Sequence, residues 1–147
     1  MNQKEANTET KNFGALIDRT LKLIKQRYLQ VFREISADLT TEQWVLLDKL
    51  AERDGVTQTE LASGSFKNAP TVSRIIELMM KKELVTKAQG TEDKRQYIIT
   101  LSTKGKDLHA HVLPHVHRLR RQGWNHLSEG DYEQFVRIMR QLEENFS

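Results

Sequence analysis

Hydrophobic residues recur every three or four positions between residues 13 and 35 of this chain. The members of this stripe are Phe13, Leu16, Ile17, Leu21, Ile24, Tyr28, Val31, Phe32 and Ile35. Such spacing places them on one face of a helix and predicts a long helix over residues 13–37. So long an apolar face needs a partner surface against which it can be buried.

A second helix is predicted to begin after Thr40. Thr40 and Gln43 match a capping box, in which two side chains satisfy free N–H groups of the first turn. The helix would stop at Gly55, and Val56 would form a short extended link. Its buried residues would be Trp44, Leu47 and Leu50.

A third and a fourth helix follow as a tandem pair. Thr57 and Glu60 match another capping box, and this helix should be short because Gly64 and Ser65 interrupt it. Asn68 can then cap the fourth helix, whose outer face would carry polar groups. The residues expected on its buried face are Val72, Ile75, Ile76, Met79 and Met80. The residues expected on or near its outer face are Ala69, Thr71, Ser73, Arg74 and Glu77.

After Leu84 the spacing changes from helical to alternating, which is typical of strands. Tyr97, Ile99 and Leu101 would share one side of a strand. The segments of the predicted hairpin are residues 85–88, the polar loop 89–96 and residues 97–101.

Two more helices are predicted at the end of the chain. Ser102 or Thr103 can cap the first, and Pro114 should break and bend it in its middle, because proline has no N–H to donate. Its apolar residues are Leu108, Val112, Val116 and Leu119. Ser128 can cap the last helix, whose apolar residues are Tyr132, Phe135, Val136, Met139, Leu142 and Phe146.

These elements predict a mainly α-helical fold with a small β-wing. A winged helix-turn-helix over residues 39–101 would be flanked by helices in residues 1–38 and 102–147. The apolar faces of the flanking helices exceed what so small a domain can cover, so we expect them to form a homodimer. The alternative is a closed bundle within one chain. The residues expected at the dimer interface are Phe13, Leu16, Ile17, Leu21, Val116, Leu119, Phe135, Met139, Leu142 and Phe146.

Charge is distributed unevenly along the chain. Residues 56–106 contain nine basic and five acidic side chains, whereas the remainder contains fourteen basic and fifteen acidic ones. The whole excess of positive charge therefore lies in the predicted winged helix, as expected of a surface that neutralises phosphates.

The chain has no cysteine, which excludes disulfides, thiolate metal sites and thiol redox switches. It also has no apolar run that resembles a signal peptide or a transmembrane helix, so a cytoplasmic protein without membrane contact is expected.

The polar loop and the strand after it carry a specific motif. The motif consists of Asp93-Lys94-Arg95, the aliphatic Ile99, Leu101-Ser102 and Gly105. It resembles the wing signature of the multiple antibiotic resistance regulator (MarR) family. Residues 70–74 followed by 84–85 resemble that family's recognition segment. The turn at residues 65–67 departs from the family's aliphatic-Gly-aliphatic pattern. The resemblance covers nearly the whole chain and implies a homodimeric transcriptional regulator, most often a repressor that responds to a ligand.

The positions of the motif residues suggest how DNA would be bound. The residues expected to contact DNA are Gln58, Thr59, Lys67, Asn68, Ala69, Pro70, Thr71, Ser73, Arg74, Lys94 and Arg95. Gln58 and Thr59 would face phosphates from a helix N-terminus, and Arg74 would face a phosphate or a guanine. Asp93 and Arg95 would pair and stiffen the wing, which leaves Lys94 free to enter a minor groove. A solvated loop that contacts nothing is the alternative.

Twofold symmetry would then place two recognition helices in successive major grooves and predicts a pseudo-palindromic operator. The resemblance also implies that a small aromatic effector binds in a crevice beside the terminal helices, for which Tyr28 and Trp44 are candidates. Packing in the core or at an interface is the alternative for both residues.

Other functions fit the sequence less well. His111 and His115 are four residues apart on one helix, but two ligands do not make a metal site, so no metal or other cofactor is expected. The chain has no Gly-rich phosphate loop, no convincing pair of carboxylates and no activated nucleophile, which argues against an enzyme. The alternative from another class is a winged-helix adaptor that binds proteins and not DNA.

Overall fold

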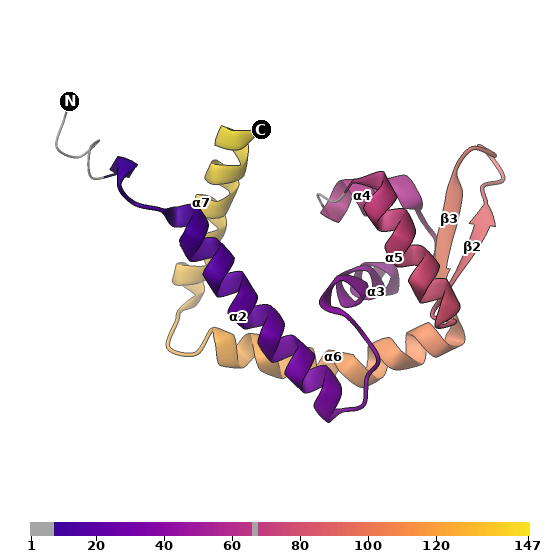
Figure 1. Ribbon diagram of the computed structural model, residues 1–147, viewed down its shortest axis with the longest axis horizontal. Helices are drawn as coiled ribbons and strands as arrows, with labels where there is room; N and C mark the ends of the chain where they lie inside the picture. Colours follow the sequence, from indigo (N-terminus) through magenta and orange to yellow (C-terminus); the bar gives the residue numbers. More distant parts are fainter. Residues whose placement is uncertain (1–7, 66–67) are drawn as a thin grey trace. The chain divides into compact units, whose positions relative to one another are not determined.

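The computed structural model describes residues 8–65 and 68–147, which form helices and one small sheet (Figure 1). The helices are α2 (Phe13–Glu34), α3 (Thr41–Glu52), α4 (Gln58–Ser65), α5 (Ala69–Lys81), α6 (Thr103–Gly123) and α7 (Glu129–Phe146). The strands are β1 (Val56–Thr57), β2 (Val85–Gln89) and β3 (Tyr97–Leu101). This order confirms the predicted fold class, a winged helix-turn-helix flanked by helices.

The chain divides into two compact units, residues 1–113 and 114–147. The division falls inside α6, which continues through Pro114 to Gly123. The predicted break at Pro114 is therefore wrong. Proline removes one N–H donor but its fixed φ is compatible with a helix, so the adjacent turns can continue on either side.

The core of the first unit lies between its helices and the sheet. Its fully buried large side chains are Phe32, Leu46, Leu47, Leu61, Val72, Ile75, Ile76, Met79, Leu84, Ile99 and Val112. Trp44 and Leu50 are buried as predicted. Met80 is not, because it lies at the edge of the α5 stripe formed by Val72, Ile76 and Met79 and is 39% exposed.

The predicted capping residues begin their helices. Thr40 and Gln43 form both bonds of a capping box: the Gln43 N–H donates to Thr40 Oγ1 at 3.0 Å, and the Thr40 N–H donates to Gln43 Oε1 at 3.3 Å. Asn68 Oδ1 accepts from the Thr71 N–H at 2.9 Å at the start of α5. Ser102 Oγ accepts from the Gly105 N–H at 3.0 Å at the start of α6.

The helix α4 differs from the prediction in two ways. Thr57 Oγ1 accepts from the Glu60 N–H at 3.1 Å, but the Glu60 carboxylate accepts from the Thr57 hydroxyl and the Arg53 guanidinium, so the capping box is half formed. The helix also runs through Gly64 to Ser65. The Gly64 carbonyl accepts from Lys49 Nζ on α3, which supplies a tertiary partner where the sequence suggested an interruption.

The sheet has three antiparallel strands in the order β1-β3-β2. The predicted hairpin is present, with Val85 opposite Leu101. Val56, expected to be a link, instead pairs with Ile99 and makes β1 a third strand. Tyr97 is on the same side of β3 as Ile99 and Leu101 but lies beyond the core and is 45% exposed.

The second unit contains the end of α6 and all of α7. Trp124 packs against Tyr132 and Phe135, with ring centroids 5.4 and 5.9 Å away. Ser128 and Asp131 form a complete capping box at the start of α7. Among the described residues, no helix is both long enough and apolar enough to cross a membrane.

Candidate nucleic-acid interface

The first turns of α5 present polar side chains to solvent. The buried stripe holds one face of α5 against the core, and α5 itself lies between α4 and the β2–β3 hairpin (Figure 1). Ala69, Pro70 and Arg74 are exposed on the opposite face, and Thr71 and Ser73 are half-buried beside them. Because the Asn68 cap fixes the first turn, these residues form one preorganised surface.

Arg74 is the cation at the centre of this surface. Its side chain is 61% exposed, and its Nη2 lies 3.8 Å from Glu42 Oε2 at the start of α3. An ion pair at this distance and exposure is weak, so a phosphate or a guanine edge could displace Glu42.

Gln58 and Thr59 lie in the first turn of α4, next to the α5 surface. Thr59 is exposed. Gln58 is half-buried, and its Oε1 is covered without a hydrogen-bond partner among the described residues. This side chain has to rotate outward before it can reach a phosphate, a requirement that the sequence did not indicate.

The wing ends in a tight turn over residues 93–96. Asp93 Oδ1 accepts from the Arg95 N–H at 3.0 Å and from Arg95 Nε at 3.2 Å, so the expected pair is present. The Gln96 N–H donates to the Asp93 carbonyl at 3.1 Å and closes the turn around this pair. The bonds from the Arg95 side chain and backbone hold the pKa of the Asp93 carboxyl below its usual value.

Lys94 occupies the exposed tip of this turn. Its carbonyl accepts from Gln89 Nε2 at 2.6 Å, which ties the tip to the end of β2. Gly90 lies beneath, where a Cβ would be 2.6 Å from the Asp93 carbonyl oxygen. The backbone of the tip is therefore held firmly while the Lys94 side chain stays accessible.

Lys87 is a further cation of the wing, and the sequence did not single it out as a candidate DNA contact. Lys87 Nζ lies 4.3 Å from the centroid of the Tyr97 ring, across the β2–β3 pair. A diagonal Lys–Tyr pair on neighbouring strands was the signal that could have revealed it. Lys67, which was expected to contact DNA, lies outside the described residues.

The residues expected in dimerisation fall into three groups by their exposure. The exposed ones are Phe13, Leu16, Ile17 and Leu21 on α2 and Phe135 and Phe146 on α7. Met139 and Leu142 are half-buried. Val116 and Leu119 are already buried in the single chain and have little surface left for a second one.

The aromatic residues considered for an effector site are engaged within the first unit. Trp44 is buried and stacks on His109, with ring centroids 5.2 Å apart. His109 Nε2 also lies 2.8 Å from Asp48 Oδ1. Tyr28 is half-buried and meets the Phe32 ring edge-on at 6.0 Å.

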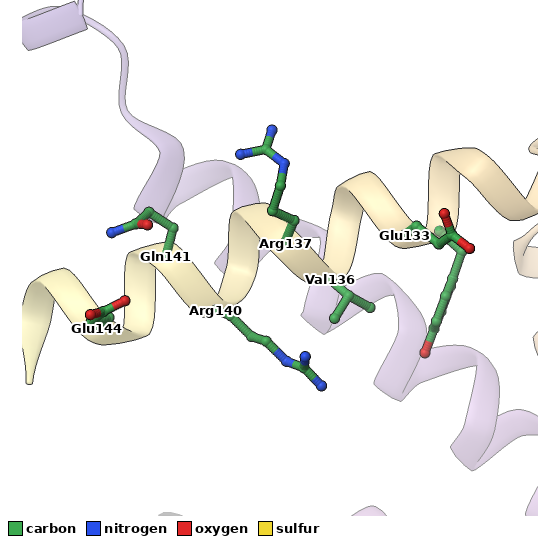
Figure 2. Close-up of a pocket in the computed structure, with 7 residues that line it drawn as sticks. Glu133, Val136, Arg137, Arg140, Gln141 and Glu144 are labelled. Atoms are coloured by element: carbon green, nitrogen blue, oxygen red, sulfur yellow. The ribbon is translucent and has the colours of Figure 1, made fainter.

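Neither of two hollows on the surface of the described residues is lined by Tyr28 or Trp44. One runs along α7 and is lined by side chains of that helix alone, which include the apolar Val136 and the charged Arg137 and Arg140 (Figure 2). The other lies in the first unit beside the end of α5. His111 Nε2 is 3.2 Å from the Ile35 carbonyl oxygen, and the described residues contain no cluster of three or more metal-ligating side chains.

Comparison with known proteins agrees with this geometry. The model of the MarR family matches residues 39–97. An uncharacterized HTH-type transcriptional regulator of Staphylococcus aureus is 26% identical over 104 residues, which make up 69% of this chain and 71% of that protein.

Solved structures share the fold. The Staphylococcus aureus MepR–DNA complex superimposes with a TM-score of 0.85 at 24% identity, over 93% of this chain and 99% of that one. The PcaV regulator of Streptomyces coelicolor, solved with its natural ligand, gives a TM-score of 0.77 at 18% identity, over 91% of this chain and 93% of that one.

Proposed function

Since this chain belongs to the MarR family of DNA-binding transcriptional regulators, we propose that it is a homodimeric repressor of a pseudo-palindromic operator. Each protomer would insert α5 into a major groove. A small effector would favour a spacing of the two helices that does not fit the operator, and so release the DNA.

The observation that carries this proposal is the exposed polar face of α5. Arg74 would contact a phosphate or a guanine, and Thr71 and Ser73 would contact bases or phosphates. Lys94, at the tip of the wing, would enter the neighbouring minor groove, with Arg95 holding the turn through Asp93. The solved MepR neighbour was captured on DNA, which supports this mode of binding.

The apolar surface of the flanking helices supports a homodimer. Seven large hydrophobic side chains of α2 are exposed in the single chain: Phe13, Leu16, Ile17, Leu21, Leu23, Ile24 and Leu29. A soluble monomer rarely exposes so continuous an apolar stripe. We assign residues 1–38 and 102–147 to dimerisation and residues 39–101 to DNA binding.

An effector site is supported by the PcaV neighbour, which was solved with its ligand. Tyr28 keeps part of its ring accessible and is the better candidate to contact an aromatic effector. Trp44 is covered by His109, so a ligand would reach its ring only by displacing that histidine.

Selection of bound sequences from a random pool of duplex DNA tests the proposal. We expect an enriched site with two inverted half-sites whose centres lie one helical turn apart or a multiple of it. The logarithm of the affinity should fall with the logarithm of the salt concentration, with a slope of about one per phosphate contact. An adaptor that binds only proteins would enrich no sequence and would show weak binding with little dependence on salt.

A further inference from the structure

Lys82, the C-cap residue directly after α5, connects this helix to the segment between α2 and α3. Its Nζ donates to the Asp38 carbonyl oxygen at 3.1 Å and to Gln43 Oε1 at 2.9 Å, and it lies 3.2 Å from Asp38 Oδ1. These partners are 44 and 39 residues away in the sequence. One ammonium group therefore joins the end of the candidate recognition helix to the point where the flanking helix α2 leads into α3.

The three contacts of Lys82 differ in strength. The Asp38 side chain is 91% exposed, so its attraction for Lys82 is screened by water and salt. Gln43 is 3% exposed, and its Oε1 is also held by the Thr40 N–H in the capping box of α3. The firm part of the connection is thus made by the Gln43 amide and the Asp38 carbonyl, while the Lys82 side chain is only 27% exposed.

The residues that follow Lys82 are attached to the other flanking helix. The Glu83 carbonyl accepts from Ser102 Oγ at 2.6 Å, and the Leu84 carbonyl accepts from the Ser102 N–H at 3.0 Å. Ser102 caps α6, so residues 82–84 contact both the segment between α2 and α3 and the start of α6 within three positions. We call residues 82–84 the α5 corner.

Apolar packing does not fill the space beside the α5 corner. An open hollow of about 510 Å³ lies there, lined by Ser36, Asp38, Lys82, Leu84, Lys104, Asp107 and Leu108. On this side, the polar contacts of Lys82 border open space, and they contribute to the connection between the segment that follows α2 and the end of α5. Loss of the Lys82 ammonium should therefore loosen the angle between the two helices without removing core packing.

We propose that Lys82 is a positioning residue that sets the angle of α5 against α2, and through it the spacing of half-sites that the dimer accepts. The proposal rests on the proposed function, since half-site spacing has meaning only for a dimer on an operator. Lys82 itself would touch neither a base nor a phosphate. Its role would be measured as the ratio of the affinities for operators with different half-site spacings.

The test uses the full chain and the operator obtained by selection, with versions that have one base pair added to or removed from the centre. Lys82→Met removes all three contacts, and Lys82→Gln is a second loss variant with a polar but shorter side chain. Lys82→Arg keeps the cation. Lys22→Met is the matched control, because Lys22 makes an exposed ion pair with Asp18 within α2, at 2.8 Å.

We expect Lys82→Met and Lys82→Gln to reduce the affinity ratio between the selected and the altered spacing by about fivefold, in the range of coupling seen within contact networks. Lys82→Arg and Lys22→Met should keep the wild-type ratio. The slope of affinity against salt should be unchanged in all variants, because no phosphate contact is lost.

An unchanged spacing ratio in folded Lys82→Met and Lys82→Gln would overturn the proposal. If these variants reduce the slope of log affinity against log salt concentration by about one, the proposal is also overturned, because Lys82 would then be a phosphate contact. Failure of the proposed function looks different: the wild-type protein itself would then enrich no site, and no spacing ratio could be measured.

Discussion

Replacing Gly105 with alanine should destabilise this protein, although such a change in most helices is stabilising. Gly105 lies in the first turn of α6, where alanine has a higher helix propensity than glycine by about 1 kcal/mol. Propensity alone therefore predicts a gain in stability. The position of the Leu84 backbone predicts the opposite.

A Cβ at residue 105 would lie 2.1 Å from the Leu84 carbonyl oxygen, where ordinary contact begins at 3.4 Å. The two backbones would have to separate by more than an ångström, which stretches the 3.0 Å hydrogen bond from the Ser102 N–H to Leu84 beyond its normal range. Overpacking costs about 1–3 kcal/mol, and an unpaired buried carbonyl costs about as much again. After the gain of about 1 kcal/mol from propensity, we expect the free energy of unfolding to fall by about 1–5 kcal/mol.

Urea denaturation followed by circular dichroism measures this change, at one fixed protein concentration because dimerisation adds to apparent stability. Gly130→Ala is the matched control, since Gly130 lies in the first turn of α7 and a Cβ there would be 3.7 Å from Ser128 Oγ, an ordinary contact. Gly130→Ala should leave the midpoint unchanged or raise it. A Gly105→Ala midpoint equal to or above that of the wild type, with an unchanged slope, would show that the Leu84 carbonyl does not oppose a side chain at position 105.

Three further substitutions test the candidate interface. Arg74→Ala should weaken operator binding by about 1–3 kcal/mol without changing the helical content of the free protein, as seen by titration and circular dichroism; full affinity would remove Arg74 from the interface. Lys94→Ala should weaken binding mainly on operators with A/T-rich flanks, and equal losses on G/C-rich flanks would disprove the minor-groove contact. Asn68→Ala removes the cap of α5 and should lower the free energy of unfolding by about 0.5–2 kcal/mol, whereas an unchanged urea midpoint would show that the cap contributes nothing.

Much of the fold could be predicted because its signals are local. The caps at Thr40, Asn68 and Ser128 each depend on a residue three positions away, and the apolar stripes need only the helical period. The hairpin could be predicted from the alternation of residues along its strands, and the pair in its loop from the spacing of Asp93 and Arg95. These features survive in the structure because no distant contact opposes them.

The features that were missed or wrongly predicted depend on residues far apart in the chain. Val56 became a strand because Ile99 lies beside it, and a segment of two residues has no periodicity to reveal this. The covered amide of Gln58 and the connection made by Lys82 are likewise properties of tertiary packing. Pro114 misled the prediction because one missing hydrogen bond does not end a helix that is supported elsewhere.

We expect two copies of this chain to act on one operator through two equivalent α5 helices. The most direct measurement is the stoichiometry of the complex on the selected duplex, combined with a map of the protected major-groove positions. We expect two chains per duplex and two protected patches related by inversion and separated by a whole number of helical turns. A single chain per duplex, or one asymmetric protected patch, would contradict it.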